Sequence, residues 1–124
     1  MLVGAGTTTP DTVVLSTAGM HPSVLHLYFQ GDAAIVAGRI YGDGVRCTGG
    51  RLLRIGAKLA VEGASIYPDT GEPTITARCA ALGFPIAPGT TRIYQVQYRE
   101  PDAAFCPPPV GANFNASNAV EITW

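Results

Sequence analysis

The stretch TRIYQVQYR, residues 91–99, decides the fold class of this sequence. Apolar or aromatic side chains occupy every second position, and polar side chains fill the positions between them. The first set is Tyr94, Val96 and Tyr98, and the second is Gln95, Gln97 and Arg99. Strict alternation is typical of a β-strand that turns one face to a core. The pattern therefore predicts a strand over 91–99 with the first set buried.

Short strand-like runs recur on both sides of this stretch, each bounded by Gly, Pro or Asp. They cover 12–16, 24–30, 33–41, 51–55, 58–62, 74–80 and 119–124. Turn signals roughly every ten residues are typical of an all-β sandwich or barrel. The sequence thus predicts one antiparallel β-sandwich domain over 11–124, Ig-like or jelly-roll-like, with about eight strands.

The composition limits the classes of partner. The chain has 124 residues, a net charge of −1 and only 14% charged residues, against roughly 25% in typical soluble domains. Such a charge balance offers no footprint for nucleic acid, and no apolar run is long enough for membrane insertion. Sparse charge instead leaves apolar surface that neighbouring molecules can cover, which favours association with copies of itself.

Residues 1–10, MLVGAGTTTP, carry no charge and differ from the rest. They are expected to form a separate N-terminal arm, either disordered or paired with a sheet edge of another subunit. In the second case the arm assembles copies into a filament. The assembly contacts would come from Leu2, Val3, Ala5, Thr7, Thr8 and Thr9.

The three cysteines are Cys47, Cys79 and Cys106, and none lies in a C-x-x-C motif, so zinc spacing is absent. Either all three are free thiols, or one disulfide leaves one cysteine over. Cys47 and Cys106 flank turn-rich segments, and a bridge between them would close a loop of about 60 residues, worth roughly 4 kcal/mol. A disulfide favours an extracellular location. Residues 1–9 do not resemble a signal peptide, so the chain is either a secreted domain whose leader is absent from this sequence or a cytosolic domain, and the disulfide favours the first.

Candidate catalytic and metal-binding residues are few. A Cys79–His26 nucleophile pair would make a small hydrolase, but both residues are expected within strands as core residues. Asp43 in one loop, and Asp69 with Glu72 in another, are candidate calcium ligands. Calcium requires six to eight oxygens, so stabilisation of turns by these carboxylates is the preferred interpretation. No catalytic residue, metal or cofactor is predicted.

Aromatic residues suggest one further possibility, because exposed rings can stack on sugars. The candidates are Tyr28, Tyr41, Tyr67 and Trp124. Aromatic residues of β proteins are usually buried in the core, which is the preferred interpretation for these four.

A set of motifs, taken together, carries a family resemblance over about residues 11–124. The stretches are DTVVLSTAGM (11–20), LYFQG (27–31), YGDGVRCTGG (41–50), RIGAK (54–58), GASIYPDTG (63–71), TITARC (74–79), IYQVQYRE (93–100), AAFC (103–106) and NFNASNAVEITW (113–124). The combination resembles a β-rich module near the C-termini of large exported proteins of planctomycete-type bacteria. The resemblance implies export, a non-catalytic structural or surface role, and a disulfide between Cys47 and Cys106 with Cys79 left over.

These observations predict an extracellular, non-catalytic structural module that self-associates, with a fibre built through the N-terminal arm as one form. The alternative is a module of a larger secreted protein that binds a glycan or another cell-surface polymer.

Overall fold

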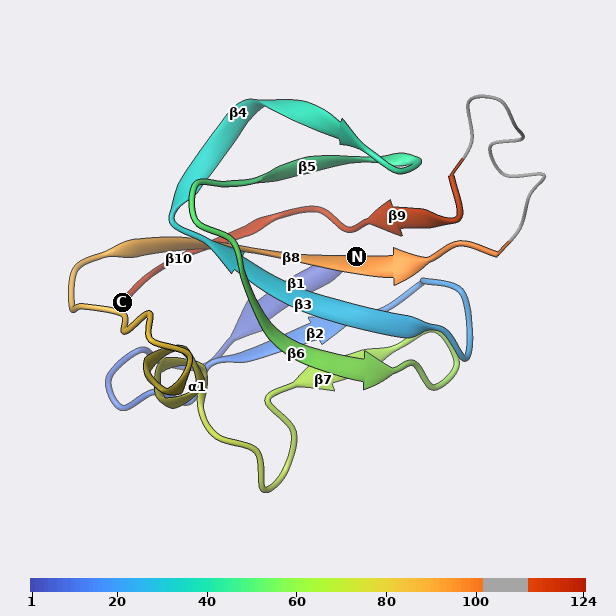
Figure 1. Cartoon of the computed structure of the whole chain (residues 1–124). Helices are drawn as coiled ribbons and strands as arrows, with labels where there is room; N and C mark the ends of the chain where they lie inside the picture. Colours follow the sequence, from blue (N-terminus) through green and yellow to red (C-terminus); the bar gives the residue numbers. More distant parts are fainter. Residues whose placement is uncertain (102–111) are drawn as a thin grey trace.

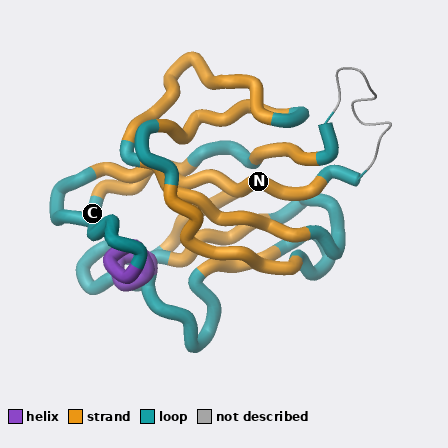
Figure 2. The backbone as a smooth tube through the Cα atoms, in the orientation of Figure 1, coloured by secondary structure: helices purple, strands orange, loops and turns teal. Residues whose placement is uncertain are grey.

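A computed structural model describes residues 1–101 and 112–124 (Figures 1 and 2). These ranges contain ten strands and one short helix, which confirms the all-β prediction, although with more strands than the eight expected. The strands are β1 (Leu2–Ala5), β2 (Val14–Thr17), β3 (Leu25–Gly31), β4 (Ala33–Tyr41), β5 (Gly44–Gly49), β6 (Leu53–Leu59), β7 (Ser65–Tyr67), β8 (Thr91–Arg99), β9 (Phe114–Ala116) and β10 (Val120–Thr123), and the helix is α1 (Ile75–Ala81).

The strands form three antiparallel sheets. The large sheet has the order β10-β8-β3-β6, and β9 also pairs with β8. The small sheet has the order β1-β2-β7, and β4 pairs with β5 as a hairpin. In Figure 1 the hairpin stands on one side of the large sheet, and the small sheet lies toward the other. The central strand β8 therefore has neighbours on both of its faces.

The core lies between the large and small sheets. Tyr94 and Val96 of β8 are fully buried, which confirms the face predicted for them, while Tyr98 nearer the strand end is half-buried. Their neighbours in the core come from strands of both sheets and from the helix: Leu2, Val13, Leu15, Tyr28, Ile55, Tyr67, Ile75 and Cys79. Contributions from both sheets and the helix therefore form one contiguous core.

The expected N-terminal arm is part of the domain. β1 pairs antiparallel with β2 of the same chain, and Leu2 is only 2% exposed. The Thr7 hydroxyl donates to the carbonyl of Pro10 (2.8 Å), which closes the turn between the two strands. Burying Leu2 in its own core over a short connection costs little loop entropy. The prediction of a free arm over residues 1–10 is therefore wrong for β1.

The strand expected over 74–80 is also wrong, because this segment contains helix α1. Thr74 is the N-cap, and its hydroxyl accepts from the Ala77 amide (3.3 Å). The Thr76 amide donates to Asp11 (2.8 Å), so a carboxylate also satisfies the helix start. Ile75 and Cys79, four residues apart, share the buried face. Capping and this spacing outweigh the β-branched residues that suggested a strand.

Replacing Val96 by alanine should lower the free energy of unfolding by about 1–3 kcal/mol, because the lost methyl groups leave a cavity between the sheets. Urea denaturation measures the change. The matched control is Arg99→Ala, at an exposed position of the same strand, which should stay within about 0.5 kcal/mol of the wild type. Equal effects of the two variants would contradict the assigned facing of β8.

Candidate functional site: the β4–β5 hairpin and its open edge

The hairpin is held on the large sheet by one buried amide. Gln95 of β8 is 1% exposed and points away from the core. Its Nε2 donates to the carbonyls of Val45 (2.7 Å) and Ser117 (2.7 Å). Its Oε1 accepts from the amides of Cys47 (3.0 Å) and Thr48 (3.3 Å). The side chain thus satisfies the inner edge of β5 as a neighbouring strand would.

The outer strand of the hairpin is the most exposed apolar element of the described fold. Val36 and Ile40 of β4 are 98% and 87% exposed, and Val45 of β5 is also exposed. A two-residue turn that begins at Gly42, whose φ is +62°, joins the strands and explains why glycine stands there. Among residues 1–101 and 112–124, β4 pairs with β5 on one side only. Its other side is an edge that carries apolar side chains.

A shallow groove of about 230 Å³ lies between the hairpin and the outer face of the large sheet. It is lined by Leu27, Phe29, Tyr41, Leu52, Arg54 and Gln97. The Tyr41 hydroxyl donates to Gln97 Oε1 (2.8 Å), and the Arg46 guanidinium lies 5.3 Å from the centroid of the Tyr41 ring. The groove is therefore aromatic and apolar with a polar rim.

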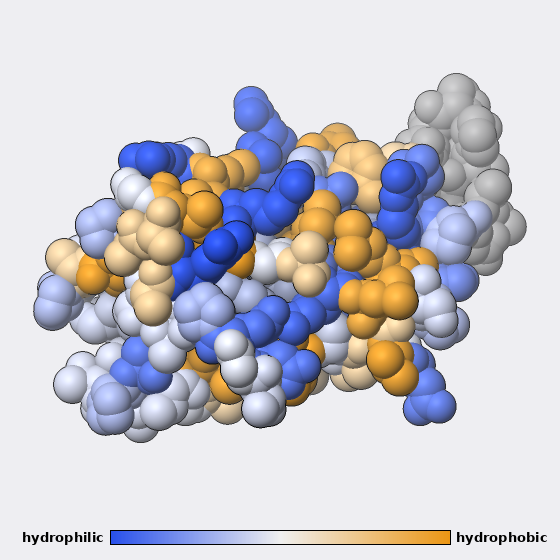
Figure 3. Space-filling model, turned by 60° about the horizontal axis from the view of Figure 1, so that its bottom comes forward, coloured by the Kyte–Doolittle hydropathy of each residue, from blue (hydrophilic) through white to orange (hydrophobic). Residues whose placement is uncertain are grey.

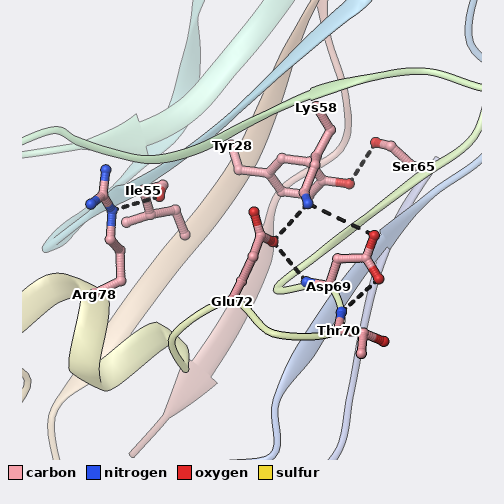
Figure 4. A network of polar contacts seen from close by, with 8 residues as sticks. All are labelled: Tyr28, Ile55, Lys58, Ser65, Asp69, Thr70, Glu72 and Arg78. Atoms are coloured by element: carbon pink, nitrogen blue, oxygen red, sulfur yellow. Dashed lines mark hydrogen bonds and ion pairs between the residues drawn. The ribbon is translucent and has the colours of Figure 1, made fainter.

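Two other edge strands are partly covered by side chains. Asn118 Oδ1 accepts from the Leu2 amide (2.7 Å), and its Nδ2 donates to the Leu2 carbonyl (2.9 Å). Arg78 Nε donates to the carbonyl of Ile55 (3.1 Å), as Figure 4 shows. Asn118 therefore closes part of the outer edge of β1, and Arg78 part of the outer edge of β6. Capping of this kind keeps a strand edge from pairing with another chain.

The candidate calcium ligands have other roles. Lys58 Nζ lies 2.7 Å from Glu72 Oε2 and 3.9 Å from Asp69 Oδ2, and the three side chains meet beside β6 (Figure 4). Asp69 also accepts from the Thr70 amide (2.7 Å), as expected for a turn. Burial alone would raise the pKa of Glu72, but the hydrogen bonds from Lys58 and the Asp69 amide outweigh it and hold that pKa below its usual value. The carboxylates of Asp69 and Glu72 therefore balance the charge of Lys58.

The third candidate ligand, Asp43, lies in the turn between β4 and β5. Its Oδ1 accepts from the Ala112 amide (2.6 Å). Over residues 1–101 and 112–124, no group of three or more metal-ligating side chains occurs. The carboxylates of Asp43, Asp69 and Glu72 act in the described structure as turn, loop and ion-pair groups.

Cys79 and His26, considered above as a nucleophile pair, have different hydrogen-bond partners. Cys79 lies on α1, where its thiol donates to Gln30 Oε1 (3.4 Å), and burial raises its pKa to about 11. His26 Nδ1 instead lies 2.7 Å from Ser65 Oγ and 3.1 Å from Thr17 Oγ1. A thiol with so high a pKa is a poor nucleophile, because the thiolate is the reactive species.

Ser65 and His26 form a contact that the sequence did not suggest. The Ser65 hydroxyl also lies 2.8 Å from the Tyr28 hydroxyl and 2.9 Å from that of Thr17 (Figure 4 shows the Tyr28 contact). Three neighbours occupy this oxygen, and Tyr28, His26 and Thr17 are buried. The arrangement is a polar cluster that joins the two sheets.

Three of the four aromatic candidates belong to the core, as the preferred interpretation predicted. Tyr28 and Tyr67 are buried with their ring centroids 5.5 Å apart, and Trp124 packs against the core while its indole donates to the Tyr94 hydroxyl (2.9 Å). Tyr41 differs, because it lies in the groove beside the hairpin. Its ring packs edge-on against Phe114, with centroids 5.1 Å apart.

The described residues include two of the three cysteines, Cys47 and Cys79. Cys106 lies outside them, so the pairing of Cys47 with Cys106 stays a prediction. Cys47 and Cys79 are not bonded to each other.

A second exposed apolar group lies away from the hairpin. Leu25 and Leu59 are cross-strand partners at one end of the large sheet, and Val61 follows in the next turn. All three are exposed. Figure 3 shows apolar side chains gathered toward one end of this face and hydrophilic ones across its middle. We call Leu25, Leu59 and Val61 the end patch.

Comparison of the chain with protein-family models, curated proteins and solved structures finds no match. In residues 1–101 and 112–124, no helix has the length and apolarity needed to span a membrane.

Stability should fall as the pH drops below about 6.5, because burial, with a smaller effect from the N-terminal ammonium, lowers the pKa of His26 in the folded state. At a pH between the pKa of His26 in the unfolded chain and its lower pKa in the folded chain, His26 binds a proton only in the unfolded chain. The unfolding free energy then decreases by up to about 1.4 kcal/mol per pH unit and levels off below the folded pKa. Urea denaturation from about pH 7.5 to pH 5 measures this slope.

The variant His26→Gln should reduce this slope, whereas His21→Gln, in the loop that precedes β3, should leave it as in the wild type. An unchanged slope in His26→Gln would show that another group causes the pH dependence.

Proposed function

We propose that this protein is a non-catalytic structural module that associates with copies of itself through the β4–β5 hairpin. The observation that carries the proposal is the nearly complete exposure of Val36 and Ile40 on β4, which pairs within the described part of the chain on one side only. Apolar side chains this exposed gain hydration free energy when a neighbour covers them, at about 25 cal/mol per Å². Large exposed apolar groups on an ordered element mark interaction surfaces.

The charge distribution supports the same function. Only 14% of the residues are charged and the net charge is −1, so copies repel one another weakly. The hairpin is also anchored by the buried Gln95 amide, so the apolar strand is presented on a fixed support. A preorganised surface loses less conformational entropy on association than a flexible one.

Sedimentation velocity over a range of protein concentrations tests this function. The wild-type chain should form a species larger than the monomer as the concentration rises, and a variant with Val36→Lys and Ile40→Lys should remain monomeric. Both positions are solvent-exposed, so the variant should keep its far-UV circular dichroism and its unfolding midpoint.

The matched control is Leu59→Lys in the end patch, which is 67% exposed. If the hairpin alone forms the contact, this variant should associate as the wild type does. A wild-type chain that stays monomeric at its highest soluble concentration, or a hairpin variant that associates normally, would overturn the proposal.

A second function is favoured by the groove. Tyr41 and Phe29, with Gln97 and Arg54 at the rim, combine aromatic rings and hydrogen-bonding groups as glycan-binding surfaces do. On this alternative, the chain binds a sugar polymer at a cell surface. Isothermal titration calorimetry with soluble polysaccharides should then show binding that Tyr41→Ala abolishes.

We further propose an extracellular location and a Cys47–Cys106 disulfide, both on the family resemblance. Mass mapping of a non-reduced digest should recover a peptide pair that joins these two cysteines. A pair that contains Cys79 would contradict this assignment.

A further inference from the structure

We propose that the thiol of Cys79 and the side-chain amide of Gln30 condense to an internal thioester, which joins helix α1 to strand β3. The inference goes beyond self-association, because it concerns a covalent bond within one chain and is independent of the hairpin. In the structure the two groups are in contact. Cys79 Sγ lies 3.4 Å from Gln30 Oε1, and that oxygen is one bond from the carbonyl carbon Cδ.

The contact is buried on both sides. Cys79 lies on the inner face of α1 with Ile75, and Gln30 shares the inward face of β3 with Tyr28. Cys79 and Gln30 are both 0% exposed. A thioester is lost by hydrolysis where water reaches it, so a site that excludes water protects the bond once it has formed.

The amide nitrogen of Gln30 has a feature that condensation would remove. Within residues 1–101 and 112–124, Nε2 is buried and has no hydrogen-bond partner. Burying an amide N–H group without an acceptor destabilises a fold. A thioester expels this nitrogen and keeps the carbonyl oxygen, which has a donor. The product therefore leaves no unpaired donor on the Gln30 side chain.

The carbonyl of Gln30 is polarised by a second buried group. The Tyr94 hydroxyl donates to Gln30 Oε1 (2.8 Å) and itself accepts from the Trp124 indole (2.9 Å). Because an indole N–H can only donate, it leaves the tyrosine proton directed at Oε1. Negative charge develops on this oxygen when sulfur adds to Cδ. A donor fixed there in advance stabilises that charge.

The atoms of the step balance without a co-reactant. The Sγ–Cδ bond forms, the Cδ–Nε2 bond breaks, and the thiol proton passes to the nitrogen, which leaves as ammonia. No group is oxidised or reduced. Burial raises the pKa of Cys79 to about 11, so at neutral pH the thiol carries the proton that the nitrogen needs. A weak nucleophile suffices, because the groups are held in contact and the reaction occurs once in each molecule.

Intact mass spectrometry of the full chain tests the bond. The protein is kept in amine-free buffer and reduced with a phosphine, so that no added amine or thiol opens the thioester. The wild-type mass should be lower than that of its sequence by one ammonia. Cys79→Ala lacks the sulfur and Gln30→Glu lacks the leaving nitrogen, so both should show their full masses. A full wild-type mass, or a loss of ammonia that persists in Cys79→Ala, would overturn the proposal.

A second measurement on the wild-type chain locates the bond and does not depend on how the variants fold. Methylamine added to the unfolded protein should attack the thioester and leave a methylamide on Gln30 and a new thiol on Cys79. Iodoacetamide then alkylates that thiol, and peptide sequencing by mass spectrometry finds both positions. A chain in which Gln30 is never methylated, or in which Cys79 is alkylated before methylamine is added, contradicts a thioester at this site.

The role of Tyr94 is tested by the rate at which the bond forms. In newly synthesised chain, followed over time by mass, Tyr94→Phe should lose ammonia about 100-fold more slowly than the wild type, because the carbonyl loses its donor. The matched control is Tyr98→Phe on the same strand, which should react at the wild-type rate. Equal rates in the two variants would refute the polarisation of Gln30 by Tyr94.

Discussion

The four hydrogen bonds of the Gln95 amide are the interaction on which the rest of the surface depends. Without them the inner edge of β5 would leave the amides of Cys47 and Thr48 and the carbonyl of Val45 unpaired beside an apolar sheet. A buried polar group without a partner costs about 1–3 kcal/mol. Because one side chain meets all of these demands, the hairpin can cover β8 without belonging to either of the two sheets that enclose the core.

The same chemistry recurs at other edges, and it connects the fold to the function we propose. Asn118 and Arg78 cap β1 and β6, and Lys58 ties the acidic loop at Glu72 to β6. Closed edges restrict where another chain can pair. On this account, copies of the chain contact one another through β4, which is apolar and, in the part of the chain that the structure describes, carries no such cap. The low charge of the chain keeps the repulsion between copies weak. Function on this account follows from which edge is left open.

The sequence predicted what local pattern can encode. The alternation over 91–99 placed Tyr94 and Val96 in the core, and the bounds of β4 and β8 match the predicted runs. It did not predict that Gln95 is buried, because periodicity assigns a side chain to a face without showing what covers that face. The prediction of a free N-terminal arm was wrong for a related reason. Leu2 is buried because β1 pairs with β2, and no local pattern in residues 1–10 encodes that pairing. No pattern in the sequence indicated that the Asn118 side chain would cap β1.

The most direct measurement of the central claim is residue-resolved hydrogen exchange on Gln95→Leu, combined with sedimentation of the same sample. Leucine fills a similar volume but satisfies none of the four backbone groups. The amides of β4 and β5 should lose protection while those of β3 and β8 retain it, and self-association should be lost with the hairpin. A hairpin that keeps wild-type protection, or a chain that still associates after the hairpin is released, would contradict the account.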